Sequence, residues 1–250
     1  LVERGINGLV VDVRGNPGGY LFSVSSIIGT LLQNGSTFAY MQDAKGVLET
    51  LNTVNKDNPY LNKLPVVLLQ NGGSASASEV LAGALKDNNR AMIVGETSFG
   101  KGTVQETHPL SKGGKLKIST HKWLTPKQQW IQHKGKEADL KVEQDELFNT
   151  DIKYYHGEFH QGDYGDEIKY VQQILSGLGY NISRKDGYFD EATVEAIDKY
   201  REQNKLEINS KLDETFFQDL TNTINEYKAR KENDQQLQMG VSYIIHSLNK

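Results

Sequence analysis

Three serines lie where a glycine loop runs into a predicted helix, and one of them could act as a nucleophile. The segment Asn71-Gly-Gly-Ser-Ala-Ser-Ala-Ser-Glu79 places Ser74, Ser76 and Ser78 at alternate positions. A serine at a helix start is ordinarily an N-cap, and three serines are more than capping requires. The unpaired backbone N–H groups of a helix start can also stabilise an oxyanion. The segment therefore suits either helix capping or acyl transfer.

A serine nucleophile needs a base, and the sequence offers histidines and a lysine. His108, His121 and His133 lie in strand-like or polar segments, where structural or surface roles are expected. Lys101 lies between two glycines, two positions after Phe99, at the start of a predicted strand. Burial of an amine favours its neutral form, which a general base requires. Lys101 is thus either an ordinary surface lysine or the base of a serine–lysine pair.

Alternating strands and helices must position both candidate segments. The runs 8–13, 65–70 and 91–95 are apolar and rich in β-branched residues, as in strands buried on both faces. Helical spacing follows at 22–32 and 75–86, and glycines stand at the strand ends. This alternation predicts an α/β layer domain. Further strands are expected at 36–41, 103–108, 115–123 and 129–132, with an exposed polar excursion at 45–62.

From about residue 158 the pattern changes to amphipathic helices. The segments 167–178, 191–203 and 213–220 carry apolar stripes and predict a compact three-helix module over 158–222. The tail 223–250 is charged and then apolar, which predicts a solvated helix that docks by its last two turns. The expected organisation is therefore 1–150, 158–222 and 223–250.

Composition restricts the classes of function. Residues 1–140 hold 15 Lys and Arg against 11 Asp and Glu, whereas residues 141–250 hold 13 against 21. Neither part is basic enough for a nucleic-acid interface, and the change of sign supports a boundary near 140–155. The absence of cysteine excludes disulfides, thiolate metal sites and a cysteine nucleophile. No apolar run approaches the roughly 20 residues of a membrane span. Because the sequence opens without Met or a leader, we expect a fragment of a longer protein.

Three blocks in order resemble the catalytic core of the carboxyl-terminal processing peptidases, the tail-specific or CtpA-like serine proteases. They are Asp12-Val-Arg-Gly-Asn-Pro-Gly-Gly19, the segment 73–87, and Thr97-Ser-Phe-Gly-Lys-Gly-Thr-Val-Gln105; a weaker fourth is Lys122-Trp-Leu-Thr-Pro126. The resemblance covers about residues 5–142. It implies a crotonase/ClpP-like α/β core.

The resemblance also implies site residues. Ser76 takes the place of the nucleophile, Lys101 that of the general base, and Gln105 that of the glutamine that orients the lysine. The backbone N–H groups of Gly19 and Ala77 match the oxyanion hole.

Asp87 matches a position sometimes described as a third relay residue. Because it follows Ser76 by eleven residues, about 16 Å along a helix axis, we expect a helix-end or surface role. Asp12 and Arg14 are expected to shape the glycine loop at residues 15–19.

By this resemblance the function is that of a serine endopeptidase that cleaves proteins near apolar C-termini without a metal or cofactor. Substrate capture would belong to a PDZ domain upstream of this chain. The absence of cysteine and the wall-type helical module described below favour an extracytoplasmic protein, anchored to the cell membrane through an N-terminal segment absent here. The oligomeric state stays open, with a homo-oligomer as one alternative. The alternatives are a non-catalytic wall- or peptide-binding protein with a protease-like core, and a crotonase-like acyl-CoA enzyme. For the fragment by itself, activity and inactivity are expected with about equal weight.

The helical module resembles a peptidoglycan-binding domain. The matching segments are Gly165-Asp-Glu-Ile-Lys-Tyr-Val-Gln-Gln-Ile-Leu175, Leu178-Gly-Tyr180, Asp186-Gly-Tyr-Phe-Asp190 and Thr193-Val-Glu-Ala-Ile197. Peptidoglycan binding and a bare packing or partner role both remain open. The two carboxylates of Asp186 and Asp190 are too few for calcium, which takes 6–8 oxygen ligands, so a turn is expected there.

Overall fold

The computed structural model describes residues 2–54 and 58–249, which form two compact units. The first unit runs to Glu143 and includes the segment from Gln236 onward, and the second spans Gln144–Gln235. The predicted tail 223–250 is therefore divided between them. No helix within the described ranges is long and apolar enough to span a bilayer.

A four-stranded parallel sheet forms the centre of the first unit. Its strands are ordered β1 (Leu9–Asp12), β4 (Val66–Gln70), β5 (Met92–Gly95) and β8 (Leu140–Lys141). All five residues of β4 are buried, which explains its unbroken apolar sequence. The α/β class predicted from the sequence is confirmed.

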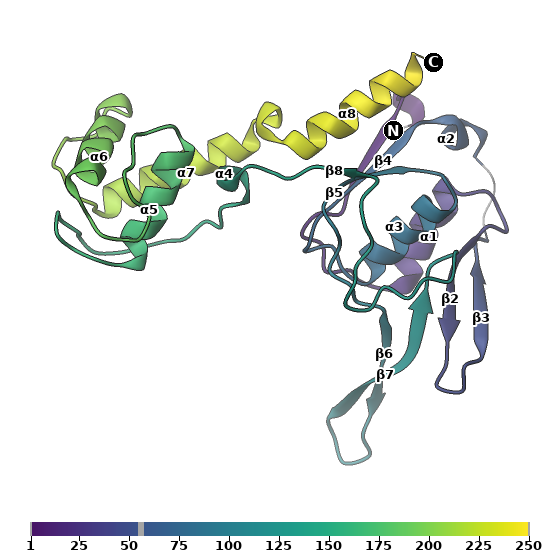
Figure 1. Cartoon of the computed structure of the whole chain (residues 1–250). Coiled ribbons are helices and arrows are strands. Elements are labelled where there is room, and N and C mark those ends of the chain that lie inside the picture. Colours follow the sequence, from purple (N-terminus) through teal and green to yellow (C-terminus); the bar gives the residue numbers. More distant parts are fainter. Residues whose placement is uncertain (1, 55–57, 250) are drawn as a thin grey trace. The chain divides into compact units, whose positions relative to one another are not determined.

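Helices cover both faces of this sheet. On one face α1 (Leu21–Leu31) and α3 (Ala77–Asp87) pack on Val66 and Leu68. On the other face α8 (Gln235–Leu248) packs on Val67 and Leu69 (Figure 1). Successive side chains of a strand point to opposite faces, so β4 supplies both cores.

The docking of α8 differs from the sequence-based expectation. Its buried residues are Gln236, Gly240 and Ile244, one per turn, so the helix docks along its length rather than by its last two turns. A Cβ on Gly240 would lie 3.0 Å from Cγ1 of Val67, which shows how closely the helix backbone approaches the sheet. The sequence does not show this four-residue spacing as an apolar stripe, because two of the three buried positions are Gln and Gly.

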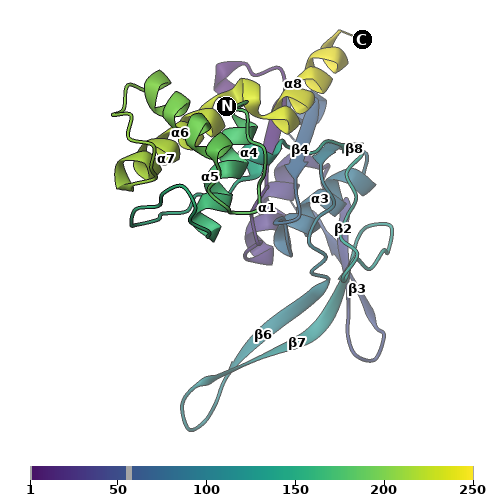
Figure 2. The ribbon, with the colours of Figure 1, turned by 60° about the vertical axis from the view of Figure 1, so that its left-hand side comes forward.

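An antiparallel sheet of two hairpins adjoins this core. Its order is β3 (Leu48–Asn52), β2 (Thr37–Gln42), β7 (Lys115–Leu124) and β6 (Thr103–Pro109), and both hairpins project from the unit (Figures 1 and 2). The expected excursion at 45–62 contains β3 and α2 (Pro59–Lys63), with residues 55–57 outside the described chain. A short 3-10 turn, Val2–Arg4, precedes β1.

The strand expected at 129–132 is wrong. This segment is irregular, and the flanking residues Gln128 and His133 have φ of 57° and 61°, which interrupt an extended chain. Its polar groups bond instead to the loop that carries Lys101, as described below.

The second unit is a small helical domain, as predicted. Its helices are α4 (Glu146–Asn149), α5 (Asp166–Gly177), α6 (Glu191–Gln203) and α7 (Glu214–Ala229), followed by the 3-10 turn Lys231–Asn233. The last long helix therefore ends at Ala229 rather than at Leu220. Asp190 and Asp213 cap α6 and α7 by accepting from backbone N–H groups.

A buried arginine organises the final loop of the second unit. The Arg201 side chain is 1% exposed, forms an ion pair with Asp213 at 2.9 Å, and donates to the carbonyls of Glu207 and Lys211. Its guanidinium also lies 5.3 Å from the ring centroid of Phe216. These contacts explain why the chain can carry a charged residue inside an otherwise aromatic and aliphatic core.

Candidate active site

The glycine loop after β1 is fastened to the start of α3 by the outer two serines. The Ser74 hydroxyl donates to the Val13 carbonyl at 2.7 Å, and the Ser78 hydroxyl donates to the Asn16 carbonyl at 3.1 Å. Both serines are buried. They hold the two loops together, which leaves Ser76 as the serine of this run that lines a pocket.

Ser76 occupies a strained turn at the N-terminus of α3. Its φ of 54° and ψ of −114° lie outside the regions that a residue with a side chain ordinarily adopts. Gly18, with a φ of 99°, packs against this turn, and a Cβ there would lie 2.8 Å from the Ala77 nitrogen and 2.9 Å from the Ser76 Cβ. Strain of this kind costs roughly 1–3 kcal/mol and is stored where neighbouring structure enforces it.

A buried carboxylate joins the turn at Ser76 to residues 98–102, the loop that carries Lys101 and is called the lysine loop below. Glu79 is 0% exposed; its Oε2 accepts from the backbone N–H groups of Ser76 and Lys101, both at 2.8 Å. Its Oε1 accepts from the Ser98 hydroxyl and the Gly100 N–H, both at 2.6 Å. The sequence alone does not single out Glu79 as a site residue. A Glu three positions after Ser76 signals a capping box, but that motif does not announce a partner loop.

The segment 125–136 supports the lysine loop from its other side. The backbone N–H of Gly102 donates to Oε1 of Gln132 at 2.8 Å, and the indole of Trp130 donates to the Gly102 carbonyl at 3.0 Å. Trp123 on β7 donates to the Lys101 carbonyl at 2.9 Å. Lys101 therefore has a fixed backbone, although it lies in a loop between two glycines.

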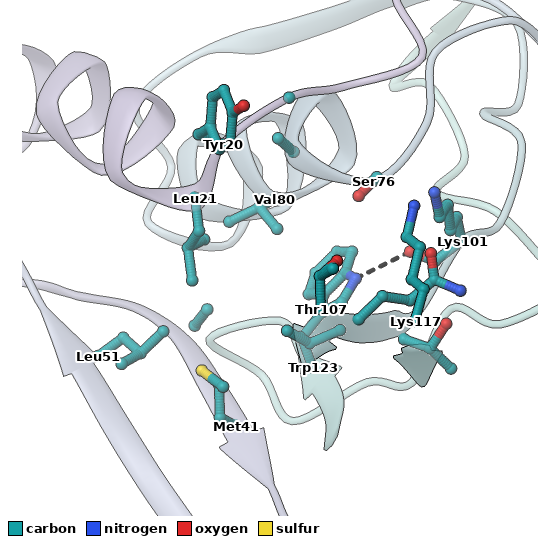
Figure 3. Close-up of a pocket in the computed structure, with 16 residues that line it drawn as sticks. Tyr20, Leu21, Met41, Leu51, Ser76, Val80, Lys101, Thr107, Lys117 and Trp123 are labelled. Atoms are coloured by element: carbon teal, nitrogen blue, oxygen red, sulfur yellow. Dashed lines mark hydrogen bonds between the residues drawn. The ribbon is translucent and has the colours of Figure 1, made fainter. Parts of the chain in front are cut away.

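One pocket of about 450 Å³ collects five of the six predicted site residues, all except Asp87: Gly19, Ser76, Ala77, Lys101 and Gln105. Figure 3 shows the side chains of Ser76 and Lys101 facing this pocket, Ser76 from the start of α3 and Lys101 from the loop before β6. The remaining lining is apolar on the side of α1, β2, β3 and α3, with Leu21, Ala39, Met41, Leu51 and Val80.

The hydrogen bonding around the pocket leaves groups available for chemistry. Within the described chain, the backbone N–H groups of Gly19 and Ala77 have no acceptor. No hydrogen bond joins the Ser76 hydroxyl to the Lys101 amine in the same part of the chain. Catalytic hydrogen bonds are often long in structures without substrate, so this separation is compatible with a dyad that closes on binding.

Comparison with known proteins decides the family. Residues 1–142 match the model of peptidase family S41. The chain belongs to peptidase family S41. Residues 164–220 of this S41 peptidase chain match the model described as a putative peptidoglycan binding domain, in agreement with the helical second unit.

Relatives within S41 have related names. The carboxy-terminal processing protease CtpB of Bacillus subtilis is 36% identical over 246 residues, which cover 98% of this chain and 50% of that protein. A probable CtpA-like serine protease of Staphylococcus epidermidis is 32% identical over 230 residues, 92% of this chain and 47% of that protein. The S41 chain therefore spans about half the length of these curated relatives.

A solved structure, the photosystem II D1 C-terminal processing protease, resembles the S41 core. It superposes with a TM-score of 0.52 at 34% sequence identity and covers 57% of this chain and 36% of that chain.

Asp87 lies outside the S41 pocket, at the C-terminal end of α3. Its side chain is 2% exposed and accepts from Lys136 Nζ at 2.8 Å and from the Lys127 backbone N–H at 3.1 Å. Burial raises the pKa of Asp87, but hydrogen bonds from Lys136, Thr125 and Lys127 and the Lys136 charge outweigh burial, so the net pKa lies below 3.8. The helix-end position agrees with the expectation, and the buried ion pair is additional.

Hydrogen bonds through Ser98 connect this ion pair to the lysine loop. The Lys136 backbone N–H donates to the Ser98 hydroxyl at 2.7 Å, and Ser98 in turn donates to Glu79. Within the described chain, Asp87 is thus linked to the lysine loop through Lys136 and Ser98 and does not itself line the pocket.

The other charged candidates lie away from the pocket. His108 and His121 lie beside Glu106 on the β6–β7 hairpin, and Asp12 holds the Arg14 guanidinium in the glycine loop. In the second unit, Arg184 pairs with Asp186, while Asp190 caps α6. Among the residues that the structure describes, no three His, Cys, Asp or Glu side chains form a metal-binding group.

Proposed function

We propose that this chain is the catalytic part of a serine endopeptidase that uses a Ser76–Lys101 dyad and an acyl-enzyme. The observation that carries the proposal is that Ser76 meets Lys101 and Gln105, which belong to a separate segment, at one pocket. Family membership and the names of the relatives support it.

The chemistry follows from the groups at the pocket. Neutral Lys101 removes the proton from Ser76 Oγ, which attacks the scissile carbonyl carbon, and Gln105 orients the lysine. The N–H groups of Gly19 and Ala77 donate to the resulting oxyanion. Protonated Lys101 then passes its proton to the leaving amine as the C–N bond breaks. Water, deprotonated by Lys101, attacks the Ser76 ester, releases the carboxylic acid and restores the hydroxyl.

The lining of the pocket favours an apolar residue at the cleavage site. Leu21, Met41, Leu51 and Val80 form an apolar wall on the side of the pocket away from Lys101 (Figure 3). Burial of an apolar side chain there contributes about 1.5–3 kcal/mol to substrate binding. This wall favours an apolar residue before the scissile bond. We also propose that the substrates are polypeptides with apolar C-termini, which the carboxy-terminal processing named for the B. subtilis relative supports.

The second unit suggests where the enzyme acts. Its match to a putative peptidoglycan binding domain supports peptidoglycan as a partner and an extracytoplasmic location at the cell envelope. A role in packing or in binding another protein is the alternative. Sedimentation with purified cell walls distinguishes them, because a packing domain would stay in the supernatant.

The dyad is tested with the protein expressed from its complete gene and an unfolded substrate that ends in an apolar tail. We expect Ser76→Ala to lower kcat/KM by at least about 1000-fold, since the attacking oxygen is lost. The matched control is Ser78→Ala, two residues away in the same turn, which removes a hydroxyl that holds the glycine loop. Equal losses in both variants, or no cleavage by the wild type, would contradict the proposal.

A further inference from the structure

A second lysine, Lys117, lines the pocket and has no part in the mechanism above. It lies on β7, opposite Thr107 of β6, and both residues line the pocket. In Figure 3 its side chain rises from the strand toward the region where Ser76 and Lys101 lie. In the described ranges the Lys117 amine has neither a hydrogen-bond nor an ion-pair partner.

The charges of the pocket are one-sided. Lys101 and Lys117 are its cationic side chains, and no Asp or Glu is among the described residues that line it. Because Lys101 must be neutral to accept the Ser76 proton, Lys117 carries the standing positive charge. An ammonium without a partner in a peptide-binding pocket is suited to a carboxylate.

The direction of the substrate follows from the mechanism. The amine that leaves must receive its proton from Lys101, so the residues after the scissile bond lie on the side of Lys101 and β6–β7. Gln105, Thr107 and Lys117 form that side, and the apolar wall lies on the other. Because Lys117 shares one pocket of about 450 Å³ with Ser76, the chain between the scissile bond and Lys117 is short.

We propose that Lys117 binds the terminal carboxylate of the substrate and thereby favours cleavage a short distance from a free C-terminus. This inference rests on the proposed function. It adds the residue that limits the distance between the cleavage site and the C-terminus, and so the length of the released peptide. Lys117 is not needed for proton transfer, so its effect belongs to substrate binding.

The inference is tested by binding in a Ser76→Ala background, where no substrate is consumed. Two fluorescent peptides of the same apolar sequence end either in a carboxylate or in a carboxamide. Their Kd values are measured by anisotropy on the chain of residues 1–250, so that an upstream PDZ domain does not contribute to the preference. Because Lys117 is exposed, we expect the carboxylate peptide to bind about threefold to fivefold more tightly, as for an ion pair in contact with solvent. Adding Lys117→Met should reduce the ratio of the two Kd values to near one.

The matched control is Lys115→Met, which removes the same charge from the same strand. Lys115 lies two positions nearer the hairpin tip, is exposed, and is not among the residues that line the pocket. It should keep the carboxylate preference. The inference is wrong if Lys117→Met also keeps the preference, or if the starting protein shows none. Cleavage by the wild type is assayed separately, so failure of the proposed function is seen as loss of hydrolysis without any bearing on the Kd ratio.

Discussion

At the scale of single residues, Lys101 is the residue whose chemistry can be tested most directly. Lys101→Arg keeps a positive charge but replaces the amine with a guanidinium that does not lose its proton near neutral pH. We expect cleavage to fall by about 100-fold or more, the range of general base catalysis. The measurement is kcat/KM at pH 8, with exposed Lys115→Arg as the control. Substantial turnover by Lys101→Arg would mean that another group acts as the base.

Glu79 is the residue that fixes the two halves of the site to each other. Glu79→Gln replaces one carboxylate oxygen, which now accepts two hydrogen bonds, with an NH₂ group that cannot accept them. We expect the free energy of unfolding to fall by about 1–3 kcal/mol. We also expect kcat to fall more than KM rises, because the Ser76 and Lys101 backbones lose their common anchor.

Urea unfolding and steady-state kinetics measure both effects of Glu79→Gln. Exposed Glu137→Gln removes a charge from the first unit without touching the pocket and serves as the control. An unchanged kcat in a folded Glu79→Gln protein would assign the carboxylate to helix capping alone.

The sequence could predict which residue types meet at the site but not what holds them there. Ser76 and Lys101 could be proposed because their blocks have an order typical of one family. Glu79 was invisible because its partners at 98–101 lie some twenty residues away, and only the folded chain brings them to one carboxylate.

At the scale of elements, the end of α3 and the segment 125–136 are joined by the Asp87–Lys136 ion pair. Because the pKa of Asp87 is lowered in the folded chain, its charged form stabilises the fold above the unfolded pKa. That contribution begins to fall once the pH drops below the unfolded pKa, about 4, and is lost as the pH falls through the lower pKa of the folded chain. Asp87→Asn should therefore cost about 3 kcal/mol of stability at pH 7, as for a broken buried pair.

The difference in free energy of unfolding between wild type and Asp87→Asn is expected to become smaller at acidic pH. Chemical unfolding of wild type and variant is compared at pH 7 and at pH 3. A difference that is the same at both values would show that the carboxylate charge does not contribute. Asp139→Asn, whose partner Lys86 is more exposed, is the control and should cost far less.

Elements with periodic sequences were predicted well, and those fixed by distant contacts were not. The buried strands 65–70 and 91–95 are read directly from their apolar runs. The segment 129–132 alternates enough to suggest a strand, yet Trp130 and Gln132 turn to satisfy the backbone of Gly102 instead. The two-residue β8 is too short to leave a pattern, and its place is set by pairing with Val94 and Gly95.

At the scale of the whole molecule, the second unit is an insertion rather than a C-terminal attachment. The chain leaves the first unit after Glu143 and returns to it at Gln236, so α8 completes the core of the peptidase unit. In the first unit, the Gln236 side chain donates to the Val142 carbonyl at 2.8 Å. The points of departure and return are therefore close together, and a short linker can join them.

This arrangement predicts opposite results for two deletions that each remove the second unit. Ending the chain at Glu143 also removes α8 and exposes Val67, Leu69 and Val94, so this variant should be unstable or insoluble. Replacing 144–235 with a short Gly/Ser linker keeps α8, so this variant should fold and retain peptide cleavage while it loses sedimentation with cell walls. Circular dichroism, cleavage and sedimentation are measured on both. Equal stability of the two variants would show that α8 is dispensable, and wall sedimentation by the linker variant would show that the second unit is not the wall-binding part.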